Sequence, residues 1–193
     1  MIIGITGGTG SGKTTLLNLL QAQGATILDC DRIYHDLLET NNDLLQAIDA
    51  RFPGCVDASG LDRKKLGAIV FSDKAALQDL NRITHSFVHQ AILARLAPKP
   101  ALAAIDAIGL FEGGLAALCD VTVAVTADEE TRIARLMARE GISREYALLR
   151  IRSQKDPAEF AAMCDHILEN NGTKEEFHHK CLAFFRNLGI MKV

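Results

Sequence analysis

The stretch GGTGSGKT at residues 7–14 decides the fold of this 193-residue chain. It matches the pattern G-x-x-x-x-G-K-[ST] in full, with the apolar run IIGIT at residues 2–6 before it and a helical pattern at residues 13–23 after it. Glycines let the backbone turn tightly, so that successive N–H groups point at phosphate oxygens at the positive end of the following helix. The stretch therefore predicts a phosphate-binding loop between a buried strand and a helix.

The side chains of this loop predict that it binds a nucleoside triphosphate and a metal ion. Lys13 is a mobile cation that can reach the β and γ phosphates, and the Thr14 hydroxyl is placed to bind Mg²⁺. ATP is favoured over GTP, because the guanine-reading pattern N-K-x-D does not occur and the nearest text is QKD at residues 154–156. The residues expected to hold ATP here are Thr9, Gly10, Ser11, Gly12, Lys13, Thr14 and Thr15.

Outward from the loop, the chain alternates between strand and helix patterns. Strands are expected at residues 2–6, 25–28, 102–108, 121–126 and 166–168, with helices between them, including residues 131–139. This order predicts an α/β fold, with a five-stranded parallel sheet flanked by helices. Residues 32–98 contain no convincing strand; helical patterns at 43–52, 63–71 and 74–96 make them a helical insertion.

Phosphoryl transfer to an alcohol needs a carboxylate beside the phosphate loop. In parallel sheets the functional residues gather at the carboxyl ends of the strands, and acids occur at these ends in this sequence. Asp31 is the first choice for the base that accepts a substrate hydroxyl proton, while Asp29 is expected to cap the next segment or bond to backbone. The alternative for Asp31 is that it only caps a helix beginning near residue 32. Asp106 has two possible roles: it holds Mg²⁺, directly or through water, or it is a buried hydrogen-bonded acid. Glu112 is a further acid, shortly beyond the same strand.

The basic residues are unevenly distributed. Residues 132–155 carry seven Lys and Arg against two acids, whereas the whole chain has a net charge of −3. Arg132, Arg135 and Arg139 recur at i, i+3 and i+7 on one helical face, and Gly141 offers a hinge. We therefore expect a lid that closes arginines over phosphates; the alternative is a solvated helix face.

Composition limits the other functions. An overall acidic balance and only 5% aromatic residues argue against a nucleic-acid binder, and no apolar run is long enough to span a membrane. The five cysteines contain no C-x-x-C, so neither disulfides nor a zinc site is indicated. His85 and His89 lack the glutamate of H-E-x-x-H, which makes a metal site there improbable. The expected protein is cytoplasmic, and either a monomer or a weak homo-oligomer.

Together these motifs resemble the dephospho-CoA kinase family, which phosphorylates the ribose 3′-hydroxyl of dephospho-coenzyme A. The resemblance covers residues 2–173 and includes DCD at 29–31, GLDR at 60–63, LNRITH at 80–85, IGLFE at 108–112 and the lid text at 135–143. Two residues depart from the family pattern: Ser86 stands where proline is usual, and Gly109 departs from the P-L-L-x-E stretch that residues 108–112 resemble.

The resemblance implies a P-loop nucleoside-triphosphate hydrolase fold and ATP with Mg²⁺ as cofactors. It implies a core of residues 1–31, 99–126 and 157–193, a helical acceptor-binding insertion at 32–98 and a lid at 127–156. By this likeness Asp31 is the base, and Arg63, His85, Leu110 and Glu112 face dephospho-CoA. Arg135 is expected to be catalytic, and Arg139 to contact ATP. The alternatives are a nucleoside or nucleoside-monophosphate kinase, or a non-catalytic nucleotide-dependent switch.

Overall fold

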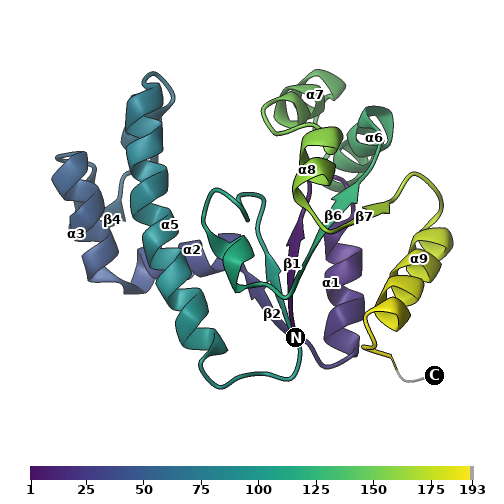
Figure 1. Ribbon diagram of the computed structural model, residues 1–193. Helices are drawn as coiled ribbons and strands as arrows, with labels where there is room; N and C mark the ends of the chain where they lie inside the picture. Colours follow the sequence, from purple (N-terminus) through teal and green to yellow (C-terminus); the bar gives the residue numbers. More distant parts are fainter. Residues whose placement is uncertain (192–193) are drawn as a thin grey trace. The chain divides into compact units, whose positions relative to one another are not determined.

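The structure is a computed structural model that describes residues 1–191 (Figure 1). The chain divides into two compact units. The first unit consists of residues 1–27, residues 100–110 and the chain from residue 115 onward. The second consists of residues 28–99 and 111–114.

A five-stranded sheet with strand order β2-β5-β1-β6-β7 organises the first unit. The pairs β1–β5, β1–β6 and β6–β7 are parallel, and the register places Ile5 beside Asp106 and Val123. This arrangement confirms the predicted five-stranded parallel α/β fold. The strands are β1 (Ile2–Thr6), β2 (Thr26–Asp29), β5 (Ala103–Asp106), β6 (Val121–Thr126) and β7 (His166–Glu169).

Helices α1 (Lys13–Ala22) and α9 (Lys174–Asn187) pack on the sheet and supply its main core. Leu16 and Leu20 of α1 and Phe185 of α9 are completely buried with Ile3 and Ile5 of β1. The α1 helix begins at the phosphate loop and ends before Gly24, whose φ of +85° suits a helix stop. The core therefore fixes the strand and the helix on either side of the loop.

Near the phosphate loop, α6 (Glu129–Glu140) and α7 (Arg144–Arg152) form a small helical pair in the first unit (Figure 1). Ile133 and Leu136 of α6 pack against Ala147 and Ile151 of α7 in a common buried cluster. Gly141 ends α6 with φ +67°. Gly141 is therefore a helix stop between two helices that share one core, and a hinge at this residue stays a prediction.

The second unit is mainly helical, as the sequence predicts for this region, and has its own core. Leu44, Ile48 and Phe52 are buried there with Leu66 and Val70. Its helices are α2 (Cys30–Thr40), α3 (Asn42–Arg51), α4 (Arg63–Val70) and α5 (Lys74–Leu96).

A two-stranded hairpin of β3 (Val56–Asp57) and β4 (Gly60–Leu61) interrupts the helices of the second unit. The prediction of no strand in this region is wrong at this point. Strands of two residues are too short to show hydrophobic alternation, and the turn is instead set by Asp57, which accepts hydrogen bonds from the Ser59 N–H and hydroxyl.

Two further short elements complete the first unit: α8 (Pro157–Met163) and a 3₁₀ turn, η1 (Leu115–Leu118). Within the described residues, no helix is both long and apolar enough to cross a membrane.

Candidate active site

The phosphate loop joins the carboxyl end of β1 to the start of α1 in the first unit. Gly12 precedes the helix with φ +107°, and a Cβ atom at this position would collide with Asn170 Nδ2. The Lys13 ammonium lies back over the loop and donates a hydrogen bond to the Gly7 carbonyl at 2.8 Å. The loop therefore has the curled, glycine-dependent form that the sequence predicts.

Side chains from outside the loop hold its carbonyl groups. Arg135 Nη1 donates to the carbonyls of Gly10 and Ser11, at 3.4 and 3.3 Å. Asn170 Nδ2 donates to the Ser11 carbonyl at 2.7 Å, and its Oδ1 accepts from Arg135 Nη2 at 3.1 Å. Because Arg135 and Asn170 bind the carbonyl groups of the loop, the loop keeps a curled shape in which its amide groups can bind a phosphate.

Thr9 is held by a second pair of side chains, from α6 and from the residues after α7. Arg132 Nε donates to the Thr9 carbonyl, and the Thr9 N–H donates to Gln154 Oε1, both at 2.8 Å. The sequence pattern placed Arg132 on the face shared with Arg135 but gave no partner for it. Gln154 and Asn170 lie within residues 2–173, over which the family resemblance extends, yet neither was predicted to contact the loop.

The remaining lid arginines are paired with acids. Arg139 and Arg150 both bond to Glu140, and Arg144 makes a two-pronged pair with Glu130 at 2.6 and 2.7 Å. The basic run is therefore more fully paired than its own two acids indicate, since Glu130 and its neighbour Glu129 lie just before the run and pair with Arg144 and Arg152. Arg132 and Arg135 are the arginines that contact the loop. Arg139 is exposed on α6, and its contact with ATP stays a prediction.

The residues present fit a Mg²⁺ ion held together with nucleotide phosphates. Thr14 lies in the first turn of α1, and Asp106 ends β5 directly beside β1, next to the strand that leads into the loop. A hydroxyl and a carboxylate are the oxygen donors that Mg²⁺ prefers when phosphates and water complete its shell. The described residues contain no group of three or more His, Cys, Asp or Glu side chains able to hold a metal ion, so phosphates would have to share the coordination.

Asp29 is the last residue of β2, Asp31 lies two residues further on, and the two have separate roles. Asp29 is the N-cap of α2, because its Oδ1 accepts a hydrogen bond from the Arg32 N–H at 3.0 Å. Asp31 is exposed in the first turn of the same helix, and in residues 1–191 its carboxylate takes part in no hydrogen bond or ion pair. The capping role considered for Asp31 thus belongs to Asp29.

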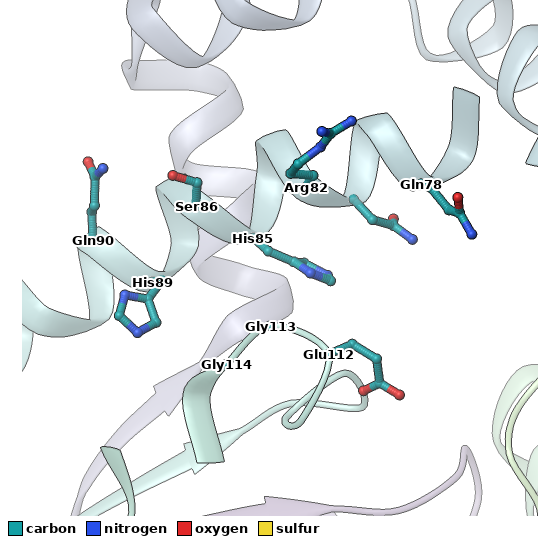
Figure 2. A pocket seen from close by; sticks show the side chains of 10 residues that line it. Gln78, Arg82, His85, Ser86, His89, Gln90, Glu112, Gly113 and Gly114 are labelled. Carbon is teal, nitrogen blue, oxygen red and sulfur yellow. The ribbon is translucent and has the colours of Figure 1, made fainter. Parts of the chain in front are cut away.

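A cavity of about 700 Å³ lies in the second unit between α5 and the loop at residues 111–114. Figure 2 shows His85 of α5 and Glu112 of the loop extending into it from different elements. Partial burial lowers the pKa of His85 below its ordinary value, so the ring favours its neutral form. Two of the predicted acceptor residues therefore line one cavity.

The other two predicted acceptor residues lie elsewhere. Arg63 is exposed at the start of α4, where its Nη2 lies 3.1 Å from His35 Nδ1. Leu110 belongs to the first unit and is completely buried, with its Cδ2 packed against the backbone of Gly4. The prediction that Leu110 faces the acceptor is therefore wrong for its side chain, which has no exposed surface with which to contact a ligand.

Comparison with known proteins agrees with the phosphate loop and the fold. The family model described as dephospho-CoA kinase matches residues 1–176. A dephospho-CoA kinase of Geobacillus kaustophilus is 35% identical over 195 residues, and the match covers 96% of each chain. One from Carboxydothermus hydrogenoformans is 36% identical, covering 96% of this chain and 93% of its own.

Solved structures give the same result. The dephospho-CoA kinase of Campylobacter jejuni superimposes with a TM-score of 0.67 at 26% identity, over 98% of each chain. A Thermus thermophilus protein superimposes with a TM-score of 0.81 at 34% identity, over 97% of each. The family model and both relatives extend over nearly the whole chain, phosphate loop and lid helices included. This chain belongs to the dephospho-CoA kinase family.

Proposed function

We propose that this chain transfers the γ-phosphoryl group of ATP to the ribose 3′-hydroxyl of dephospho-coenzyme A, giving coenzyme A and ADP. The observation that carries the proposal is the phosphate loop, whose carbonyls are held by Arg135 and Asn170 in a chain that matches the family throughout. Such a loop supplies the positioning and charge stabilisation on which phosphoryl transfer depends.

The nucleotide half of the reaction belongs to the first unit. In this proposal the loop from Thr9 to Thr15 surrounds the β and γ phosphates, which are held by the Lys13 ammonium and by loop amides other than that of Thr9, whose N–H donates to Gln154 Oε1. Thr14 and Asp106 would hold Mg²⁺, which when bound neutralises charge on the phosphate oxygens. Arg135 and Arg139 add positive charge from the lid, as catalytic and nucleotide-contacting residues respectively.

Asp31 is the base in this proposal. Its carboxylate takes the proton from the acceptor hydroxyl while that oxygen forms a bond to the γ-phosphorus. The bond between the γ-phosphorus and the oxygen bridging to the β-phosphate breaks, and ADP leaves. An exposed carboxylate without an internal hydrogen-bond partner is available for this step, whereas Asp29 is occupied by the cap of α2.

The acceptor half is assigned to residues 32–98 and the loop that carries Glu112. His85 and Glu112 line a cavity large enough for a small-molecule acceptor, and its walls are polar side chains of α5 such as Gln78 and Asn81. Neutral His85 can donate one hydrogen bond and accept another. Arg63 is proposed as a further acceptor contact.

One assay separates this function from the alternatives. ADP release is measured in parallel with dephospho-coenzyme A, AMP, CMP, uridine and gluconate as acceptors. We expect rapid release with dephospho-coenzyme A alone. Rapid release with a nucleoside or a nucleoside monophosphate would instead identify that other kinase class, and ATP binding without transfer to any acceptor would favour a nucleotide-dependent switch.

A further inference from the structure

We propose that Arg132 and Gln154 form a brace that holds Thr9 of the phosphate loop in the orientation that binds ATP. They are positioning residues for the nucleotide. The inference rests on the proposed function in one respect, that the loop binds ATP, and it is independent of which acceptor is used.

The brace is a closed ring of three hydrogen bonds. Gln154 Oε1 accepts from the Thr9 N–H at 2.8 Å, and Arg132 Nε donates to the Thr9 carbonyl at 2.8 Å. Arg132 Nη2 then donates to the same Gln154 Oε1 at 3.2 Å, which closes the ring. Both backbone polar groups of Thr9 are therefore held, so the peptide planes on its two sides cannot rotate without breaking a bond.

Arg132 is buried to a degree that is unusual for an arginine. Only 3% of the residue is exposed, and in residues 1–191 it makes no ion pair with a carboxylate. Its charged neighbour Glu129 pairs with Arg152 and compensates the Arg132 charge only in part, since burial is the larger effect and lowers the pKa of Arg132. A buried guanidinium is costly unless it is hydrogen-bonded and its charge is compensated. The backbone carbonyl and Gln154 supply hydrogen bonds, and the phosphates of a bound nucleotide would supply the compensating charge.

Steric contacts show that the loop is shaped around this side chain. A Cβ atom at Gly8 would collide with Arg132 Nη2, and one at Gly10 would lie 3.0 Å from the Arg132 carbonyl oxygen. Glycine at both positions therefore lets the start of α6 lie directly on the loop. Gln154 reaches Thr9 from the end of α7, and the core shared by α6 and α7 fixes the two brace residues relative to each other.

The test compares nucleotide binding with acceptor binding in single variants. ADP binding is measured by calorimetry, and KM values for ATP and dephospho-coenzyme A are measured separately. For Arg132→Met we expect at least a tenfold rise, on the order of the loss of a charged hydrogen bond, in the Kd of ADP and the KM of ATP. The acceptor KM should stay within about twofold. Arg132→Lys, which keeps the charge but not the two-pronged geometry, should give an intermediate rise.

Two more variants resolve the role of Gln154. Gln154→Met should weaken ADP binding, and combining it with Arg132→Met should cost less than the two single effects together, because both remove the same ring. Arg144→Met is the matched control: it removes an exposed lid arginine paired with Glu130 and should leave ADP binding unchanged.

The inference is overturned if Arg132→Met and Gln154→Met both bind ADP within twofold of the unchanged protein. It is also overturned if the KM values for ATP and acceptor rise equally along with a lower melting temperature, because that pattern indicates a purely structural role. Failure of the proposed function looks different: the unchanged protein would then not phosphorylate dephospho-coenzyme A, while the ADP affinities would still follow the pattern of the brace.

Discussion

Asp29 and Asp31 are neighbours in the sequence, but they have different surroundings at the start of α2. Asp29 satisfies the Arg32 N–H, whereas Asp31 is exposed on the helix without such a partner in the described chain. A residue that caps a helix contributes to stability, and one that accepts a proton contributes to rate. Substituting each of them separates the two contributions.

We expect Asp31→Asn to lower kcat by at least about 100-fold, the scale of general-base catalysis, with ATP binding largely intact. The measurement is steady-state ADP release with saturating ATP and dephospho-coenzyme A, together with calorimetric ADP binding. Near-normal turnover in this variant would remove Asp31 from the mechanism.

Asp29→Ala should lower the free energy of unfolding by about 1 kcal/mol, because the first turn of α2 loses its cap. Asp29→Asn is the matched control, since asparagine caps helices about as well as aspartate. Urea denaturation of both variants measures the difference. Equal stability of the alanine and asparagine variants would show that the cap contributes nothing.

His85 gives a prediction for pH dependence. Burial lowers its pKa in the folded chain below the ordinary value of 6.5, so the unfolded chain binds the proton more readily. The stability that the neutral ring contributes is complete above pH 6.5 and is lost as the pH falls through the lower, folded-state pKa. Between pH 8 and pH 5 the unchanged protein should lose more free energy of unfolding than His85→Gln does. An equal loss in urea denaturation would contradict the role of burial.

At the scale of elements, α6 and α7 share a buried core, and exposed ion pairs also join the two helices. Leu136 is completely buried between the two helices, while Met137, next to it, is 40% exposed. We expect Leu136→Ala to lower the free energy of unfolding by about 2–5 kcal/mol, and Met137→Ala by less than about 1 kcal/mol. Urea denaturation measures both. Similar small losses would show that the helix pair is not packed as described.

The elements that the sequence predicted well are those with a local signal. The apolar strand β1, the glycine loop and the start of α1 each follow from residue types within a few positions. The hairpin β3–β4 could not be predicted in this way, because its strands are too short for a periodic pattern. Helix α9 also lacked a prediction, although Thr173 and Glu176 form a capping box that marks its beginning.

The site residues show the same limit. The glycine pattern locates the curled loop between β1 and α1, and the run of arginines falls largely on α6 and α7. Tertiary packing determines which arginine contacts the loop. Arg132 is buried against Thr9, whereas Arg144 is exposed and pairs with Glu130. Leu110 was assigned to the acceptor from a motif alone, and its burial beside Gly4 is a property of the folded sheet.

At the scale of the whole molecule, a net charge of −3 averages over very different regions. The basic run at residues 132–155 keeps an excess of positive charge, although Glu129, Glu130 and Glu140 pair with four of its arginines. The positive charges next to the loop are those of Arg132 and Arg135, together with Lys13 in the loop itself. The division into core, acceptor-binding insertion and lid stays a prediction.

The most direct test of the central claim is the identity of the reaction product. The protein is incubated with ATP, Mg²⁺ and dephospho-coenzyme A, and the product is examined by phosphorus NMR, with the 3′-deoxy acceptor as a control. We predict one new phosphomonoester on the ribose 3′-oxygen, ADP in equal amount, and no product from the 3′-deoxy acceptor. A phosphate at another position, or transfer to the 3′-deoxy acceptor, would contradict the account.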